Sequence, residues 1–395
     1  MHYSNPQIRL IARRIPILCA LYFVVFCFLY LILFQRDVLA QVQFEFSHGA
    51  NAYHPLLSAV LCTILLSLVG FAASGLLSWL PLRMKALPWF VPFLLLGALT
   101  HWHFPYIGDI QQAPGWGAYL VLLFAYGCLL MLGFIMQDSF KERQTFFAYA
   151  WPNALILILF TTICVWLSNT NDLSHKTLTA ARYIGNGDDG KAIDVIKWQR
   201  HPSHQISAMT ALALSRSGQL GEQLFAFPQP HGSEGLLPIE GDTLLFVNVR
   251  RIIGEHLGYK RGKKISATRF LEVTDTMPKS HAALRDYLLS AYLLDRNLTA
   301  FRARLLKPDA FSKPYTGEEA DSLFATLPKH YREALLLQQH LHPQATDTLC
   351  DSHNQERLRE FIQLMESTSN PDEREFACRN LFPDTYWCYY YFGNR

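Results

Sequence analysis

Five apolar runs in the first 170 residues dominate this chain, because each is long enough to cross the hydrocarbon core of a bilayer. The first run, Ile15 to Phe34, holds 20 residues and no charge. A helix rises about 1.5 Å per residue, so 20 residues match a core of about 30 Å. The other runs cover residues 56–80, 86–104, 114–136 and 149–168. We therefore predict a bundle of about five transmembrane helices over residues 1–170.

Two of these runs allow a second interpretation. The first follows basic residues, as a secretory signal peptide does, but a signal core holds only about 7–15 apolar residues, so we interpret the run as a retained helix. The third contains Pro88 and Pro92. Proline ends a helix in water but is tolerated in lipid where neighbouring helices satisfy the freed carbonyls. If the third run were only re-entrant, the number of crossings would be even.

The basic residues of the connecting segments indicate which side of the membrane each one faces. With the N-terminus in the cytoplasm, the inner segments carry seven Lys and Arg residues, and the outer loops carry only Arg36. Cytoplasmic loops are enriched in Lys and Arg. This bias favours five crossings in a bacterial inner membrane, with a cytoplasmic N-terminus and a periplasmic C-terminal domain after Ser168.

The remaining residues, 171–395, differ sharply in composition. They hold 27 of the 35 basic and 27 of the 32 acidic residues of the chain, so their formal charge is zero. A nucleic-acid partner requires a surplus of basic residues, and this balance argues against one.

Helical periodicity is the main signal in residues 171–395. Leu284, Tyr287, Leu288 and Ala291 follow the i, i+3, i+4, i+7 spacing of an amphipathic helix. Glycine-rich turns at residues 185–190 and 217–221 each separate two helix-compatible stretches, and their spacing is near the 34 residues of a tetratricopeptide repeat. The predicted fold class is therefore all-α, with a soluble α-solenoid of tetratricopeptide-like hairpins after the membrane bundle.

Four stretches carry a resemblance to a known family. They are Phe34-Gln35-Arg36-Asp37, Tyr53-His54-Pro55-Leu56, residues 327–335 (LPKHYREAL) and the aromatic cluster from Trp387 to Phe392. Over nearly its whole length the chain resembles multi-pass membrane proteins of Bacteroidetes-type bacteria that are known only as a domain of unknown function. The resemblance implies a membrane location and a tetratricopeptide-like C-terminal half, and it implies no activity.

Acids and imidazoles gather in the two predicted outer loops, at the same membrane face. Such groups could serve as general bases or metal ligands in a transferase or hydrolase that acts on an envelope glycan or lipid. Polar loops beside aromatic residues are equally typical of headgroup anchoring. The candidates are Asp37, Glu45, His48 and His54 in the first loop, and His101, His103 and Asp109 in the second.

Two further groups lie in the C-terminal domain. Zinc needs Cys and His at suitable spacings, and no CxxC pair accompanies His340, His342 and His353, so we expect no metal site and no cofactor. In the periplasm a disulfide between two of Cys350, Cys378 and Cys388 is more plausible, and the three possible pairings stay open. The second group is a basic segment that could bind an anionic headgroup or an acidic glycan. Its residues are Arg250, Arg251, Lys260, Arg261, Lys263 and Lys264.

These features favour a membrane-anchored scaffold or binding protein whose partners are the lipid bilayer and a protein or peptide held by the helical repeats. The terminal aromatic cluster would then cap the last helix pair. The sequence has no Walker loop, GxSxG elbow, HExxH motif or kinase signature, which favours a role without catalysis. The alternative is an envelope transferase or hydrolase that uses the outer-loop residues.

Overall fold

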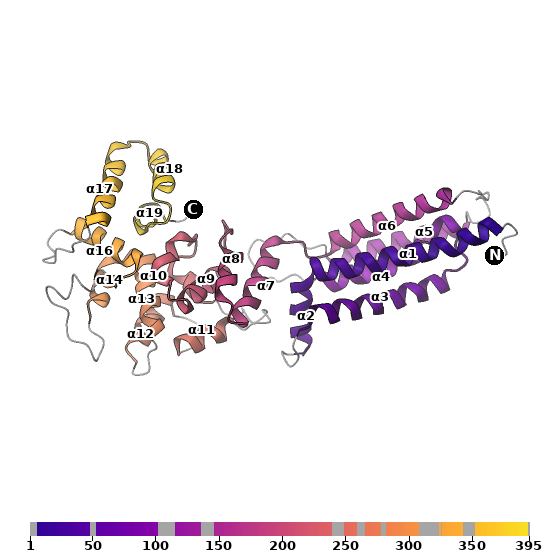
Figure 1. Cartoon of the computed structure of the whole chain (residues 1–395), viewed down its shortest axis with the longest axis horizontal. Coiled ribbons are helices and arrows are strands. Elements are labelled where there is room, and N and C mark those ends of the chain that lie inside the picture. Colours follow the sequence, from indigo (N-terminus) through magenta and orange to yellow (C-terminus); the bar gives the residue numbers. More distant parts are fainter. Residues whose placement is uncertain are drawn as a thin grey trace. The chain divides into compact units, whose positions relative to one another are not determined.

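The computed structural model describes residues 6–47, 53–101, 115–135, 146–238, 249–258, 265–277, 282–307, 324, 326–342 and 352–393. Over these residues every regular element is a helix, so the all-α prediction is confirmed for the part of the chain that is described (Figure 1). The chain divides into two compact units. We call the residues up to Leu178 the N-terminal bundle and those from Thr179 onward the C-terminal unit.

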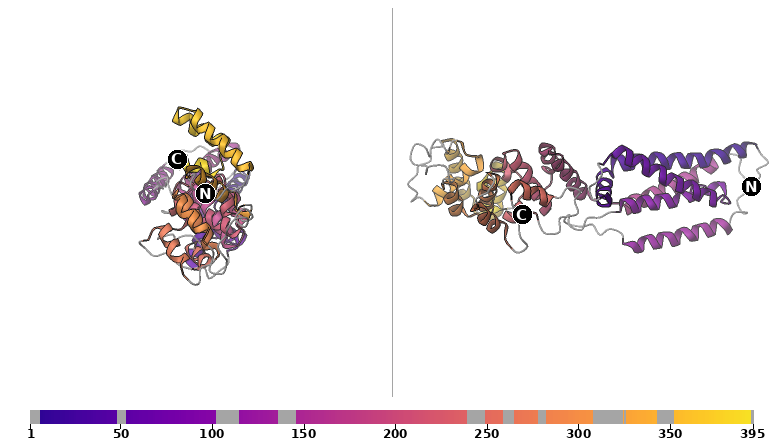
Figure 2. Two further views of the ribbon diagram at one scale, coloured as in Figure 1. Left: turned by 90° about the vertical axis from the view of Figure 1, so that its left-hand side faces the viewer. Right: turned by 90° about the horizontal axis from the view of Figure 1, so that it is seen from below.

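The N-terminal bundle consists of long apolar helices that run side by side (Figure 2). Five segments, at residues 10–33, 55–76, 82–100, 116–135 and 147–167, are long and apolar enough to cross a membrane. Residues 36–47, which we predicted as part of an outer loop, form a helix instead. The elements are α1 (Pro6–Leu33), α2 (Arg36–Ser47), α3 (Pro55–Leu76), η1 (Leu82–Met84), η2 (Leu87–Trp89), α4 (Phe90–Thr100), α5 (Trp116–Ile135) and α6 (Phe147–Leu167).

The two prolines of the third apolar run lie where a helix tolerates them. Pro88 belongs to the short helix η2, and Pro92 lies in the first turn of α4, where a backbone N–H would have no intrahelical acceptor. This span is also the most enclosed of the five. In its most apolar 18 residues 61% are buried, against 17–39% in the other spans. The segment that carries the prolines is therefore the centre of the bundle, packed against α3 and α6.

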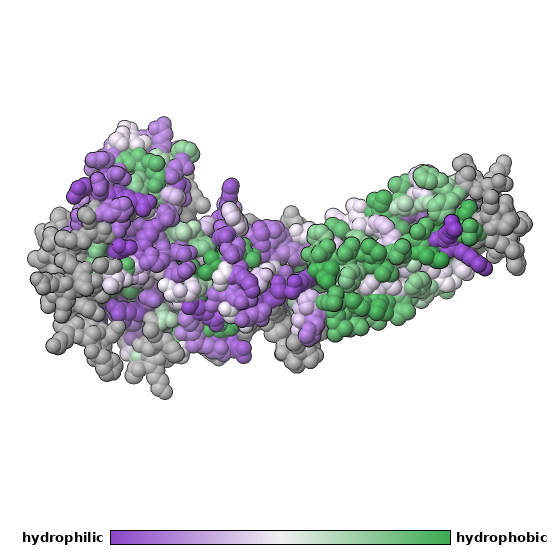
Figure 3. Space-filling view, viewed as in Figure 1, coloured by the Kyte–Doolittle hydropathy of each residue, from purple (hydrophilic) through white to green (hydrophobic). Residues whose placement is uncertain are grey.

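The outward-facing side chains of the bundle are apolar and its interior includes small and polar ones. Leu65 and Phe124 are 62% and 76% exposed, whereas Thr63, Ser67 and Gly70 on α3 are buried. Figure 3 shows the resulting apolar surface over the bundle, in contrast to the polar surface of the C-terminal unit. Continuous apolar surface of this extent is unfavourable in water and is compatible with a membrane protein.

A buried asparagine ties the irregular segment before α4 to α6. The Oδ1 atom of Asn153 accepts a hydrogen bond of 2.7 Å from the backbone N–H of Ala86. Its Nδ2 atom donates to the carbonyls of Leu82, at 2.9 Å, and Tyr149, at 2.7 Å. Backbone groups outside regular helix need such partners where water is absent, so one side chain makes the break between η1 and η2 tolerable in lipid.

The C-terminal unit is an array of shorter helices in which the same turn occurs three times. After α7, α9 and α13, a residue with positive φ follows the helix: Gly187 (80°), Gly218 (69°) and Arg296 (57°). Each turn has the two reverse hydrogen bonds of a Schellman ending, for example Asp188 N–H to Tyr183 O, and the next helix begins two residues after the residue with positive φ. Both glycine turns lie where the sequence predicted helix breaks.

The helices of this unit pack around α9 and α13. Every residue of α9 from Gln205 to Leu214 is buried, and so are Leu284, Tyr287, Leu288 and Ala291, the predicted stripe of α13. The helices are α7 (Asp172–Gly185), α8 (Asp189–Ile196), α9 (His204–Arg216), α10 (Leu220–Gln223), η3 (Leu224–Ala226), η4 (Gly232–Leu236), α11 (Val249–Leu257), α12 (Ala267–Asp275), α13 (Ala282–Leu294), α14 (Leu298–Leu305), α16 (Lys329–Leu341), α17 (Ser352–Ser367), α18 (Pro371–Leu381) and α19 (Tyr386–Phe392).

Two glycines of α3 provide a matched test of packing in the bundle. A Cβ atom at Gly70 would lie 2.5 Å from the indole ring of Trp89, whereas one at Gly75 would meet nothing within 4 Å. We expect Gly70→Ala to destabilise the bundle by about 1–3 kcal/mol through overpacking. Gly75→Ala should be neutral or stabilise it by up to about 1 kcal/mol. Thermal unfolding in detergent measures both, and equal stability of the two variants would contradict the packing of α3 on η2.

Candidate functional site

The outer-loop candidates lie only partly within the described residues. His48, His103 and Asp109 are outside them, and Glu45 lies on α2 at a position whose side chain is not described. Asp37 is half-buried in the first turn of α2, and His54 is exposed immediately before α3. Among the described residues no three His, Cys, Asp or Glu side chains gather as metal ligands would. The catalytic hypothesis for these loops stays a prediction.

His101 lies at the end of α4 against aromatic rings. Its Nδ1 atom is 2.9 Å from the carbonyl oxygen of Leu167 on α6, and its ring centroid is 5.8 Å from that of Trp116 and 5.4 Å from that of Tyr119. These contacts link α4, α5 and α6 at one end of the bundle. An imidazole between indole and phenol rings suits the polar boundary of a bilayer.

Next to His101 the ends of three helices share a buried polar cluster. The Nε2 atom of the Gln35 amide donates to the hydroxyl of Tyr30, at 2.9 Å, and to the carbonyl of Asn169, at 3.0 Å. The hydroxyls of Thr100 and Ser168 are 2.6 Å apart. This network fixes where α1, α4 and α6 end relative to one another, which is a structural role.

The basic segment is described only at its start. Arg250 and Arg251 lie on α11, where the Arg251 guanidinium is 3.5 Å from the carboxylate of Glu255. Lys260, Arg261, Lys263 and Lys264 lie outside the described residues. Binding of an anion by this segment therefore stays a prediction.

Cys378 and Cys388 are both buried, on α18 and α19. Their thiols are in hydrogen-bond contact, which raises the pKa of Cys378 and lowers the pKa of Cys388. Cys350 lies outside the described residues, and the exposed His340, His342 and His353 do not join the two thiols in any metal-binding group among the described residues. The choice of disulfide pairing stays a prediction.

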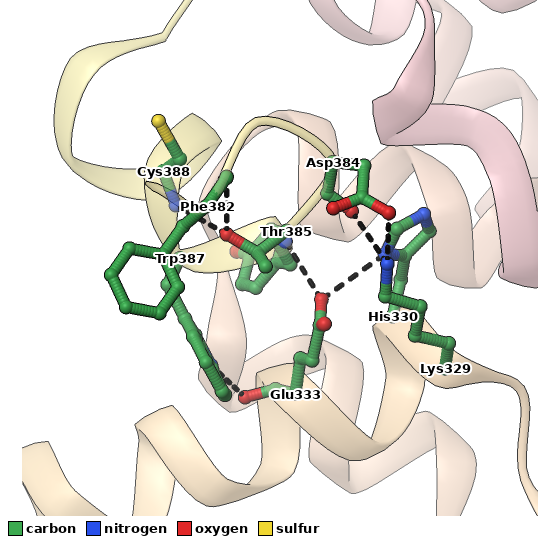
Figure 4. A network of polar contacts seen from close by, with 9 residues as sticks. Lys329, His330, Glu333, Phe382, Asp384, Thr385, Trp387 and Cys388 are labelled. Atoms are coloured by element: carbon green, nitrogen blue, oxygen red, sulfur yellow. Dashed lines mark hydrogen bonds and ion pairs between the residues drawn. The ribbon is translucent and has the colours of Figure 1, made fainter. Parts of the chain in front are cut away.

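The most elaborate polar arrangement of the C-terminal unit surrounds Glu333 on α16 (Figure 4). The side chains of Glu333 and His330 are each about 1% exposed, and His330 Nδ1 is 3.1 Å from Glu333 Oε2. The same Oε2 atom accepts a hydrogen bond of 2.8 Å from the backbone N–H of Tyr386, at the start of α19. Glu333 therefore accepts a hydrogen bond from an N–H group in the first turn of α19, which has no acceptor within its own helix. We call these three residues and Trp387 the C-terminal clasp.

The clasp fixes α19 through aromatic side chains as well. The indole N–H of Trp387 donates to the carbonyl of Glu333, at 2.8 Å, and both Tyr386 and Trp387 are fully buried. The hydroxyls of Tyr386 and Tyr389 donate to the carbonyls of Leu293 and Leu294, at the end of α13. The Tyr389 bond gives a partner to a carbonyl in the last turn of α13, and the Tyr386 bond adds a second donor to the Leu293 carbonyl, which also accepts from the N–H of Arg296. These bonds tie α19 to the end of α13.

An ion pair closes the clasp on its outer side. The Lys329 ammonium is 2.6 Å from Oδ2 of Asp384 and donates to the Asp384 carbonyl at 3.1 Å. Burial opposes ionisation of Asp384, but the hydrogen bond and charge of Lys329 outweigh it and hold the pKa of the carboxyl below its ordinary value. The pair joins the start of α16 to the turn that leads into α19.

The helices held by the clasp carry a groove of about 540 Å³ between α17 and α18. Phe361 of α17 contacts the rings of Phe382 and Trp387, with centroid distances of 5.4 and 5.9 Å. The clasp residue Trp387 is therefore connected through Phe361 to Phe382, which lines the groove. The lining combines apolar and polar side chains: Arg357, Glu360, Gln363, Leu364, Ser367, Leu381 and Phe382.

The sequence analysis did not identify Glu333 or His330 as a structural centre. Both lie on the face of α16 that is otherwise apolar, since Tyr331, Ala334 and Leu335 around them are also buried. Ionisable residues are rarely buried without a partner. An acid and an imidazole three positions apart, among apolar residues of one helix, are a sequence pattern that could have indicated a buried polar pair at this position.

Removing the Glu333 carboxylate should loosen α19. In Glu333→Met the backbone N–H of Tyr386 and the His330 ring lose their acceptor while they stay buried, which should cost about 1–3 kcal/mol of unfolding free energy. Glu366→Met, at an exposed position of α17, is the matched control. Thermal unfolding and the rate of proteolytic cleavage near the C-terminus measure the effect. Equal behaviour of the two variants would show that the clasp does not hold α19.

The Asp384–Lys329 pair predicts a dependence of stability on pH. Because the pKa of Asp384 is lower in the folded chain than the ordinary value of about 3.9, the pair stabilises the fold above that pH. This contribution is lost as the pH falls through the folded-state pKa. The Asp384 side chain is 47% exposed, so the effect should stay below about 1 kcal/mol. Asp384→Asn should lower the unfolding temperature at pH 6, and the difference from the parent should shrink as the pH falls below about 3.9; a difference that stays constant with pH would contradict the assignment.

Comparison with known proteins places the whole chain in one family. Neither a curated protein nor a solved structure matches it significantly. A family match covers residues 7–261 and 264–393, which include the N-terminal bundle, the clasp and the α17–α18 groove. The chain therefore belongs to the family described as "Family of unknown function (DUF6057)".

Proposed function

We propose that this protein is a membrane-anchored binding protein of the bacterial inner membrane, whose C-terminal unit holds a segment of a partner protein in the α17–α18 groove. In this proposal the N-terminal bundle is the multi-pass anchor, and the helical hairpins of the C-terminal unit are tetratricopeptide-like and lie in the periplasm. The resemblance to membrane proteins of Bacteroidetes-type bacteria and the excess of basic residues in the predicted inner segments support this arrangement.

One observation carries the proposal: large apolar side chains are exposed on the hairpin that bounds the groove. Phe376 is 72% and Leu381 is 61% exposed. Figure 3 shows apolar surface between polar surfaces at α17 and α18. Exposed apolar clusters with a polar rim mark interaction sites in soluble domains.

The lining of the groove indicates what it would bind. Leu364, Leu381 and Phe382 provide an apolar floor, and Arg357 and Glu360 provide charges of both signs. A groove between two helices accepts the apolar face of a third helix, which presents anchors at i, i+3, i+4 and i+7. The proposed ligand is therefore an amphipathic helical segment with both acidic and basic residues beside its apolar face.

Photo-crosslinking in intact cells tests this proposal. A photoreactive phenylalanine analogue is placed at Leu381, which lines the groove, and at Trp198 as a control, since that side chain is 75% exposed but does not line the groove. We expect a discrete protein adduct from position 381 and none from position 198. Leu364→Asp, which puts a charge on the groove floor, should reduce the adduct about ten-fold or more.

Three results would contradict the proposal. They are the absence of a protein adduct at position 381, an adduct of equal yield at position 198, and an adduct that Leu364→Asp leaves unchanged. Circular dichroism of the Leu364→Asp variant shows whether its fold is intact, so that loss of binding is separated from unfolding.

A further inference from the structure

A second groove lies on the N-terminal bundle, between α1 and α6, and encloses about 570 Å³. This volume is within the range of about 300–1,000 Å³ that is typical of small-molecule sites. Ala150 and Ala154 of α6 leave space that a larger side chain would fill. The α1 wall consists of Ile15, Leu18, Cys19, Leu21, Tyr22, Val25 and Phe26.

The interior of this groove offers no polar group that a ligand would have to satisfy. Asn153 is among its lining residues, but its Oδ1 atom and both hydrogens of its amide already bond to backbone groups. The hydroxyl of Tyr22 lies 3.0 Å from that of Thr161. The occupant within the groove must therefore be a hydrocarbon.

The length of the groove fits one leaflet of a bilayer. Its lining extends along α1 from Ile15 to Phe26 and along α6 from Phe146 to Ile158. Eleven residue steps at about 1.5 Å each span roughly 16 Å, which is about half of a hydrocarbon core of about 30 Å. A single acyl chain of one leaflet covers this distance, whereas a transmembrane helix of a partner would extend well beyond it.

Positive charge lies at one end of the groove. Arg14 precedes the lining residues Leu18, Leu21 and Val25 by 4, 7 and 11 positions, so it continues their helix face by one turn, and it is exposed. Arg13 is also exposed but lies on the opposite face of α1, because it precedes Ile17 by one turn and Ile17 is not in the lining.

The same end holds the N-terminus of α6. Its N-cap residue is Phe146, which has no side-chain oxygen to accept a hydrogen bond from the first turn. The first backbone N–H groups of a 21-residue helix, together with its dipole, attract an anion. Arg14 and this helix end therefore make one end of an otherwise apolar groove suitable for a phosphate.

We propose that the groove between α1 and α6 binds an anionic glycerophospholipid. One acyl chain fills the groove, and the phosphate lies between Arg14 and the N-terminus of α6. This lipid belongs to the leaflet at the N-terminal end of α1. The site is separate from the α17–α18 groove, and neither proposal depends on the other.

Native mass spectrometry of the full chain in detergent tests this site, with phosphatidylglycerol and phosphatidylcholine of identical acyl chains as probes. We expect the parent to retain phosphatidylglycerol in preference. Arg14→Gln should lower the affinity for it about five-fold, as expected for one basic residue at a lipid surface, and Arg13→Gln should leave it unchanged. Ala154→Phe should abolish retention of both lipids, whereas Ala72→Phe, at an exposed position of α3, should not.

The proposal would be overturned by any of three results. They are equal retention of the two lipids by the parent, equal effects of Arg14→Gln and Arg13→Gln, and unchanged retention in Ala154→Phe. Unfolding temperatures of the four variants in detergent show whether a loss of lipid reflects a loss of fold. If Ala154→Phe unfolds early, Ala150→Leu replaces it, because leucine narrows the groove with a smaller side chain.

Discussion

The apolar outer surface of the N-terminal bundle is the constraint on which the rest of this structure depends. The helices of the bundle expose residues such as Leu65 and Phe124 and bury residues such as Thr63, Ser67 and Asn153. This arrangement is compatible with a bilayer, where every backbone group needs a partner inside the protein. Asn153 meets that requirement for the segment between η1 and η2, and Gln35 joins the ends of α1 and α6.

The C-terminal unit has an apolar interior beneath a polar surface, and the clasp places two ionisable side chains within that interior. Glu333 and His330 are buried together, and their cost in hydration is offset by the N–H of Tyr386 and by aromatic contacts such as that of His330 with Phe225. Trp387 also contacts Phe361, which in turn contacts Phe382 in the lining of the α17–α18 groove. The clasp therefore connects α19 to the groove.

Local patterns in the sequence were sufficient for much of the fold. The apolar runs indicated the candidate spans, and Gly187 and Gly218 marked helix ends because a positive φ is easy for glycine. The sequence did not reveal contacts between distant segments, such as Glu333 with Tyr386, 53 residues apart, or Asn153 with Ala86, 67 residues apart. Single polar residues of this kind carry no periodic signal, and which side chain faces them is decided by tertiary packing.

We propose, above all, that five crossings place the N-terminus and the C-terminal unit on opposite sides of a membrane. The most direct measurement uses two reporters on the full chain: a fluorescent protein that matures only in the cytoplasm, and a phosphatase that is active only outside it. Each is fused in turn before α1 and after Ser168. The account predicts fluorescence from the N-terminal fusion and phosphatase activity from the fusion after Ser168. Activity of the same reporter at both positions would mean an even number of crossings and would contradict it.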